Sequence, residues 1–130
     1  MADDLFNAAR AVMANAHAPY SKFPVGAALR SASGVIYVGC NVENASYPEG
    51  WCAETSAIAA MVAAGETAVA EIAVVARQMP LITPCGGCRQ RLAEFAGPDA
   101  RIHLCDASGI IETVMLGELI PRAFAVESRS

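Results

Sequence analysis

Three cysteines and one glutamate have the types and the spacing that metal-dependent chemistry needs. Cys52 stands two residues before Glu54 in "WCAETSA", and Cys85 and Cys88 lie in "PCGGC". A structural zinc site closes with four protein ligands, whereas a catalytic one keeps three and leaves the fourth position open. A carboxylate beside an open position can move protons to and from water. Three thiols and one carboxylate therefore favour a catalytic zinc site.

Two predicted helices would position these thiols. The run 85–97 is a predicted helix, and the i, i+3 spacing places Cys85 and Cys88 on one side of its first turn. A second helix, 52–64, opens with Cys52. Each helix start carries about half a positive charge, which favours thiolates. If the two helix starts converge, three thiolates surround one point.

Other interpretations of these residues remain open. A fourth ligand could come from one of four residues, although each also has an ordinary place in a strand or near a helix end: Cys40, Cys105, His17 and His103. A C-x-x-C at a helix start is also typical of thioredoxin-like redox sites. A dithiol pair needs neither a third cysteine nor C-x-E, so metal binding is favoured. Glu54 by itself could simply complement the helix dipole.

The remaining pattern predicts the elements that hold the site. A first amphipathic helix is expected over 3–17, a loop over 41–50, and strands over 25–30, 35–40, 71–77, 101–106 and 110–116. The helix over 52–64 is small or apolar all round, which predicts burial on most of its faces. The link "ASG" is too short for a parallel crossover, so the last two strands should be antiparallel. We predict one α/β domain over 1–130, with three α/β/α layers and a mixed five-stranded sheet.

Composition restricts the partners of the chain. Apolar residues make up 55% of its 130 residues and the mean hydropathy is +0.37, which predicts a homo-oligomer. The net charge of −4 and the scattered Lys and Arg residues disfavour long nucleic acid as a partner. An acidic start and the lack of a long apolar run predict a cytoplasmic protein that does not enter a membrane. Five cysteines in such a protein are expected to be free thiols.

Five motifs together resemble the zinc-dependent deaminase superfamily, and more narrowly the small homotetrameric cytidine deaminases. They are "PYSKFPVGAAL", "GCNVENASY", "CAE", "PCGGCRQ" and "LIPRAF", in the order of the family and over nearly the whole chain. The resemblance implies a cytidine deaminase-like fold. It also implies hydrolysis of cytidine and 2′-deoxycytidine to the uridines with release of ammonia, in pyrimidine salvage.

The resemblance also implies a role for individual residues. Cys52, Cys85 and Cys88 would bind one Zn²⁺ per chain, and Glu54 would carry protons between water, pyrimidine N3 and the leaving ammonia. The nucleoside would be bound by seven residues: Asn41 and Glu43 at the sugar, Phe23 and Val25 as an apolar wall, backbone at Ala53, and Tyr47 and Phe124 reaching a neighbouring subunit's site. Without the family resemblance, these residues could have purely structural roles: Phe23, Val25 and Phe124 in the core, and Asn41 and Glu43 in turns.

One position departs from the family pattern. The family usually carries arginine directly after the glutamate, where it tempers the charge of the cysteines, and here that position is Thr55. Arg89, next to Cys88, could compensate; otherwise the site is more negative. The departure and the unusual "PEGW" leave the substrate open, and the alternative is another cytosine nucleoside such as a blasticidin-type antibiotic. An alternative from a different class is a non-catalytic zinc-stabilised module.

Overall fold

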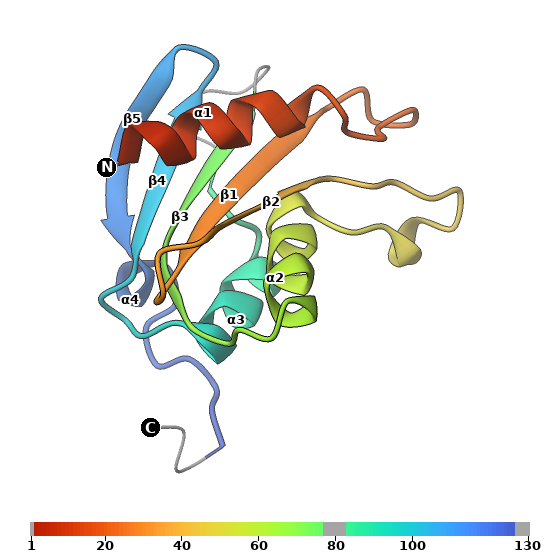
Figure 1. Ribbon diagram of the computed structural model, residues 1–130. Helices are drawn as coiled ribbons and strands as arrows, with labels where there is room; N and C mark the ends of the chain where they lie inside the picture. The colour runs from red at the N-terminus through yellow and green to blue at the C-terminus, as the bar shows by residue number, and fades with distance from the viewer. Residues whose placement is uncertain (1, 77–82, 127–130) are drawn as a thin grey trace.

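Small and apolar residues occupy both faces of the strand β1 (Val25–Ser31), as expected for a strand that is covered on both sides. The computed structural model describes residues 2–76 and 83–126, and it places β1 inside a five-stranded sheet of order β2-β1-β3-β4-β5 (Figure 1). The other strands are β2 (Ile36–Cys40), β3 (Val69–Ala76), β4 (Arg101–Asp106) and β5 (Gly109–Met115). Only the β3–β4 pair in this sheet is parallel. The predicted mixed sheet and fold class are confirmed.

Helices cover the two faces of the sheet (Figure 1). The helix α1 (Ala2–Met13) buries its apolar stripe against one face, and α2 (Ala53–Ala63) and α3 (Gly86–Phe95) lie on the other. Two glycines set how closely the helices approach. A Cβ at Gly26 would lie 2.1 Å from the carbonyl oxygen of Ala9 in α1, and a Cβ at Gly39 would lie 2.4 Å from the amide nitrogen of Ala57 in α2. Side chains at these two positions would push both helices off the sheet.

The β4–β5 connection is an antiparallel hairpin, as the short "ASG" link predicted. Asp106 Oδ1 accepts hydrogen bonds from the amide of Ser108 at 2.8 Å, its hydroxyl at 2.7 Å and the amide of Gly109 at 3.2 Å. Gly109 has a φ of 159°, close to extended backbone. One carboxylate therefore organises the whole turn.

Three details differ from the sequence predictions. The first helix ends at Met13 rather than residue 17, because the amides of residues 14–16 bond to carbonyls three residues back, which tightens and ends the helix. A 3₁₀ turn, Tyr47–Glu49, interrupts the predicted loop, and a short helix, α4 (Leu116–Leu119), follows β5. The last residue of the predicted strand 71–77 lies outside the described residues.

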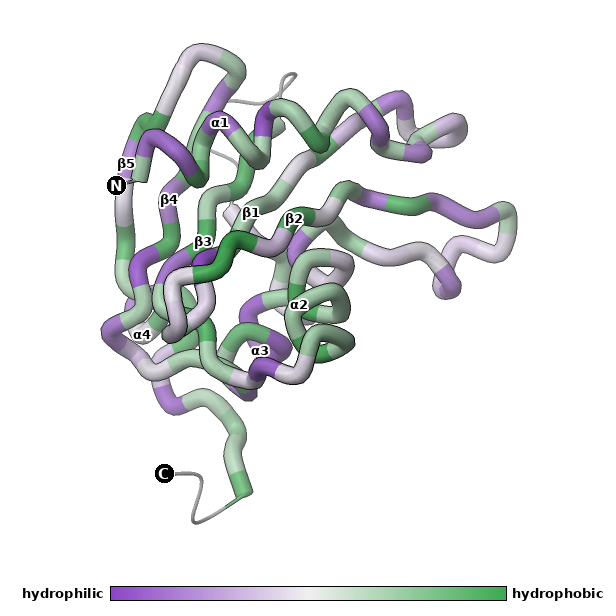
Figure 2. The backbone as a smooth tube through the Cα atoms, viewed as in Figure 1, coloured by the Kyte–Doolittle hydropathy of each residue, from purple (hydrophilic) through white to green (hydrophobic). Residues whose placement is uncertain are grey.

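The helix α2 is less buried in the single chain than its composition predicted. Figure 2 shows that it is largely hydrophobic along its length, and its inner face is buried. Its outer face is nevertheless exposed at Ala60, Val62 and Ala63. The prediction of burial on most faces is therefore wrong for the isolated chain, because the sheet and α3 cover only one side. Within the described ranges, no helix is both long and apolar enough to cross a bilayer.

A polar network joins four strands beneath α1. His103 Nε2 lies 2.8 Å from Glu71 Oε1, and His103 Nδ1 lies 2.8 Å from Thr113 Oγ1. The guanidinium of Arg30 donates to Glu71 Oε2 at 3.0 Å and to Asp4 Oδ1 at 2.6 Å. His103 is buried, so its polar atoms need these partners. The network explains a histidine that the sequence offered as a candidate metal ligand.

Replacing Glu71 by glutamine is expected to weaken the acid dependence of stability. Burial raises the pKa of Glu71, but hydrogen bonds from His103 and Arg30 outweigh it and hold this pKa below its ordinary value of 4.5. A lowered folded pKa contributes stability above pH 4.5, and this contribution is lost as the pH falls through the folded pKa. Urea unfolding from pH 7 to pH 3 measures it.

The control is Glu112→Gln, on the exposed side of β5. We expect Glu71→Gln to be less stable than the wild type at pH 7 and to lose less free energy of unfolding on acidification. An equal slope in Glu71→Gln and Glu112→Gln would contradict a role of the network in acid stability.

Candidate active site and metal centre

The three cysteines of the sequence motif meet at the starts of two helices. Cys52 is the N-cap residue of α2, Cys85 is the N-cap residue of α3, and Cys88 lies in the first turn of α3. Their sulfur atoms all lie within 4.8 Å of one another, and the Sγ atoms of Cys52 and Cys85 are 3.7 Å apart. Tetrahedral zinc with Zn–S bonds of about 2.3 Å separates its sulfurs by about 3.8 Å. The donor set and its spacing therefore fit zinc.

The four alternative fourth ligands do not join this cluster. Among the described residues, the group of side chains that could hold a metal consists of the three cysteines alone. Cys105 is buried beneath α1 on the opposite face of the sheet, and His103 is committed to the polar network there. Three protein ligands leave one position for water, which is the arrangement of catalytic zinc sites.

Burial and the neighbouring thiols dominate the electrostatics of the site. The Cys88 thiol donates a hydrogen bond to the Cys52 sulfur, which lowers the pKa of Cys52. That bond, together with burial, raises the pKa of Cys88. Burial also raises the pKa of Glu54, which is only 4% exposed. A carboxyl with a raised pKa can hold and release a proton closer to neutral pH than an exposed one.

A pocket of about 330 Å³ opens beside the cluster. This volume lies at the lower end of the roughly 300–1,000 Å³ of small-molecule sites. Eight of the residues singled out from the sequence line it: Phe23, Val25, Asn41, Glu43, Cys52, Ala53, Glu54 and Cys85. Residues from the segment before β1, the start of β1, the loop after β2, the start of α2 and the start of α3 thus converge on one cavity.

Asn41 fastens the apolar wall of this pocket. Its Oδ1 accepts a hydrogen bond from the amide of Val25 at 2.9 Å, and its Nδ2 donates to the carbonyl of Phe23 at 2.9 Å. A primary amide has two N–H donors and two acceptor lone pairs, so one of each remains for another partner. Asn41 therefore supports the local backbone and still has capacity to bind a ligand.

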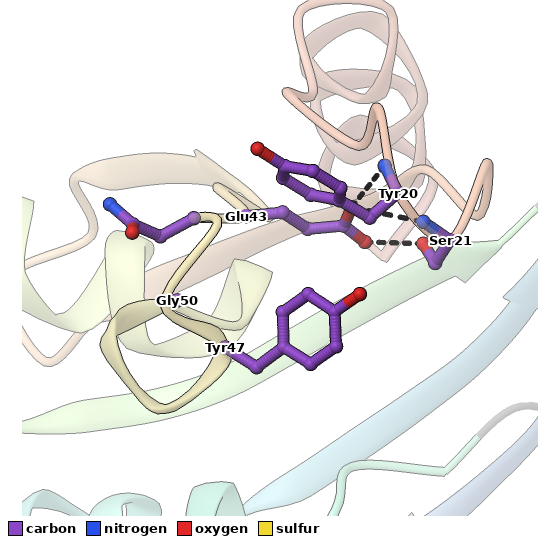
Figure 3. Close-up of a pocket in the computed structure, with 6 residues that line it drawn as sticks. Tyr20, Ser21, Glu43, Tyr47 and Gly50 are labelled. Carbon is purple, nitrogen blue, oxygen red and sulfur yellow. Dashed lines mark hydrogen bonds between the residues drawn. The ribbon is translucent and has the colours of Figure 1, made fainter.

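Glu43 holds the turn that precedes the pocket wall. Its Oε1 accepts hydrogen bonds from the amides of Tyr20 at 2.9 Å and Ser21 at 3.1 Å, and its Oε2 accepts from the Ser21 hydroxyl (Figure 3). These bonds, led by the one from the hydroxyl, lower the pKa of Glu43. The carboxylate is therefore ionised near neutral pH and faces two cavities at once.

The second of these cavities, also about 330 Å³, is the one drawn in Figure 3. Tyr20 and Tyr47 both line it and form a tilted ring pair with centroids 5.9 Å apart, and Tyr47 is 74% exposed. Tyr47 does not line the pocket at the cysteines. Phe124 does not line it either, because its side chain is 75% exposed in the C-terminal segment.

The two residues expected next to the metal ligands have different partners. Thr55 Oγ1 lies 3.5 Å from Cys88 Sγ. Arg89 donates instead to three oxygens: the carbonyls of Pro84 at 2.8 Å and Leu119 at 2.9 Å, and Thr83 Oγ1 at 3.2 Å. The hypothesis that Arg89 compensates the sulfur charge therefore has no support from its contacts, which tie α3 to its flanking segments.

Three pocket residues were not found by sequence reasoning: Ser21, Val74 and Thr83. Ser21 lies within the motif "PYSKFPVGAAL", so its signal was present but no role was assigned to it. The sequence around Val74 indicates only a strand, and Thr83 is only a residue before a proline, so neither position carries a signal for a binding site. Only the spatial arrangement shows that both line the cavity.

Comparison with known proteins agrees with this site. Residues 1–104 match the family model described as the cytidine and deoxycytidylate deaminase zinc-binding region. The cytidine deaminase of Sporosarcina psychrophila is 44% identical over 88% of this chain and 85% of its own length. A crystal structure of the cytidine deaminase from Burkholderia pseudomallei is 43% identical, with a TM-score of 0.88 over 93% of this chain and 97% of that one. That from Mycobacterium tuberculosis is 36% identical, with a TM-score of 0.85 over 95% and 96%.

The chain therefore belongs to the cytidine and deoxycytidylate deaminase family. Its cofactor is zinc, for which the three clustered cysteines provide the ligands. The family resemblance seen in the sequence motifs is confirmed.

Proposed function

We propose that this protein hydrolytically deaminates cytidine and 2′-deoxycytidine to uridine and 2′-deoxyuridine, releasing ammonia, as a step of pyrimidine salvage. The observation that carries the proposal is the position of Glu54. It is a buried carboxyl two residues from one zinc ligand, and it lines a pocket whose other residues suit a nucleoside. Enzymes named cytidine deaminase at 44% and 42% identity support the same activity.

Each group of the pocket has a task in this reaction. Cys52, Cys85 and Cys88 would hold the zinc, which would supply a Lewis acid able to lower the pKa of water toward neutral. Glu54 accepts one proton from the attacking water and delivers it to N3 of the pyrimidine. It then takes the second proton from the hydroxyl now attached to C4 and passes it to the amino group, so that the C4–N bond breaks, ammonia leaves and C4 keeps the oxygen as a carbonyl. Its raised pKa suits a residue that must both take up and give back a proton. Water and cytidine are thereby converted to uridine and ammonia, with all atoms accounted for.

The remaining lining residues hold the substrate. Phe23 and Val25 form an apolar wall for the flat base, and backbone at Ala53 reads the edge of the pyrimidine. Asn41 and Glu43 bind the sugar hydroxyls, with the amide group oriented by its two bonds to the wall and the carboxylate oriented by the turn at Ser21. Because these orienting bonds exist before substrate arrives, little ordering is needed on binding.

The carboxylate of Glu43 favours a nucleoside over a nucleotide. Two like charges about 4 Å apart repel by roughly 1–4 kcal/mol at effective dielectric constants between 80 and 20. With zinc-loaded protein, kcat/KM for cytidine should therefore be at least about tenfold higher than kcat/KM for its 5′-monophosphate. The loss of ultraviolet absorbance of each substrate measures the two values. Comparable turnover of the monophosphate would contradict this preference.

A larger cytosine nucleoside of the blasticidin type is the alternative substrate. The second cavity supports it, because it shares Ser21 and Glu43 with the pocket at the cysteines and so offers further space beside the expected sugar-binding residues. Turnover of the antibiotic with none of cytidine would favour this alternative.

We further propose a homotetramer of single-domain subunits, each comprising residues 1–130, with one zinc per chain and active sites shared between subunits. The exposed aromatic rings of Tyr47 and Phe124 and the exposed apolar face of α2 support assembly. The five free thiols suit the reducing cytoplasm.

A further inference from the structure

Besides Cys52 and Glu54, the zinc ligand Cys88 has two polar neighbours that come from different helices. Cys88 has 0% of its surface exposed and is the most buried of the three cysteines. Arg91, one turn further along α3, places Nη1 3.9 Å from its sulfur, and Thr55 of α2 places Oγ1 3.5 Å from the same atom. The buried sulfur therefore receives donors from both helices that carry the ligands.

The backbone of α3 leaves space for the guanidinium group. A Cβ at Gly87 would lie 3.2 Å from Nη1 of Arg91, closer than ordinary van der Waals contact. The guanidinium therefore lies over Gly87, and a side chain at this position would reduce the space for it. The contact with the sulfur and the space at Gly87 both concern Nη1 of Arg91, and together they place the positive charge of Arg91 beside the metal ligand.

We propose that Arg91, assisted by Thr55, compensates the negative charge of the three-thiolate zinc centre. Zinc with three thiolates carries a formal charge of −1, which is costly to bury. The guanidinium can donate a charge-assisted hydrogen bond to the sulfur. Arg91 acts through Cys88, and is therefore a positioning residue rather than a catalytic one.

Arg89 does not take this part, although it is the arginine adjacent to Cys88. Three of its nitrogens donate to oxygens of Pro84, Leu119 and Thr83. A helix places i and i+3 on one side and i+1 on another, so the residue three positions on is the one that reaches back to the sulfur.

The test is the zinc affinity of Arg91→Gln, measured by competition with a chromophoric chelator. Loss of a group that supports a metal ligand typically weakens metal binding by 10–100-fold, and Arg91 is exposed, so we expect about tenfold. Arg91→Lys, which keeps the charge, should retain most of the affinity. Arg101→Gln, an exposed arginine on β4, controls for the change in net charge.

Ionic strength separates charge from packing. The difference between wild type and Arg91→Gln should shrink when sodium nitrate is raised from about 0.05 M to about 1 M, because salt screens exposed charges. Wild-type affinity in Arg91→Gln would overturn the proposal, and so would an Arg91→Lys variant as weak as Arg91→Gln.

The significance of Arg91 for catalysis rests on the proposed deaminase activity, but this titration does not. It requires no substrate, so a failure to deaminate cytidine would leave its result unaffected. Conversely, a wild-type zinc affinity in Arg91→Gln together with rapid cytidine turnover would contradict the charge-compensating role of Arg91 and leave the proposed deaminase activity intact.

Discussion

Glu54→Gln is expected to lower the rate of cytidine deamination by at least about 100-fold, since a positioned general acid–base group contributes roughly 10²–10⁴-fold to a rate. Glutamine has nearly the same shape and can still accept a hydrogen bond, but it cannot take up a proton from water and pass it on. The buried position of Glu54 excludes solvent as an easy substitute. The decrease in ultraviolet absorbance of cytidine measures the rate.

Two controls accompany this variant. Zinc content should remain at the wild-type level, because Glu54 is not among the clustered metal ligands. Glu112→Gln, on the exposed side of β5, should retain the wild-type rate. A zinc-loaded Glu54→Gln protein that deaminates cytidine at the wild-type rate would remove Glu54 from the mechanism.

Cys85→Ser is expected to abolish zinc retention and, with it, deamination. A neutral serine hydroxyl is a far weaker zinc ligand than a thiolate, and two remaining thiolates cannot complete the three-ligand set. The loss should exceed the 10–100-fold that removal of a supporting residue costs. Cys85 is exposed at the helix start, so the substitution should not disturb the core. Zinc content after dialysis against a mild chelator measures the effect.

Cys40→Ser is the matched control for this experiment. Cys40 is also a free, partly exposed cysteine, but it ends β2 and lies outside the cluster. It should keep one zinc per chain and near-normal activity. Equal zinc loss in Cys40→Ser and Cys85→Ser would show that the assignment of ligands is wrong.

The element order and the mixed sheet were predictable because their signals are local. The β-rich runs, the helical spacing of apolar residues and the short "ASG" link each depend on neighbouring residues. The end of α1 was not predictable, because the alanine-rich run continues past Met13 while its hydrogen bonds change. The partial exposure of α2 also escaped prediction, since composition does not tell whether a face is covered by the same chain or by another.

The metal ligands were predictable from residue type and spacing, whereas the supporting contacts were not. Adjacency in the sequence suggested Arg89 as the partner of the sulfurs, but the guanidinium near Cys88 belongs to Arg91. Helical periodicity places Cys88 and Arg91 on one side of α3, but it does not show that Arg89 forms hydrogen bonds with other parts of the chain. The hydrogen bonds of Asn41 and Glu43 to nearby backbone likewise depend on loop geometry that no local pattern specifies.

Cys52 and Cys85 are 33 residues apart in the sequence, and all of β3 lies between them. An ion that binds both cysteines therefore closes a long loop. Closing this loop costs conformational entropy in the unfolded chain, whereas in the native chain the two cysteines are already close together. Because zinc binds the native state preferentially, the free energy of unfolding should increase by about 1.4 kcal/mol for each tenfold increase in free zinc above the dissociation constant. The melting temperature should rise accordingly. The cofactor would thus also act as a reversible cross-link, and the free zinc concentration would contribute to the stability of the folded chain.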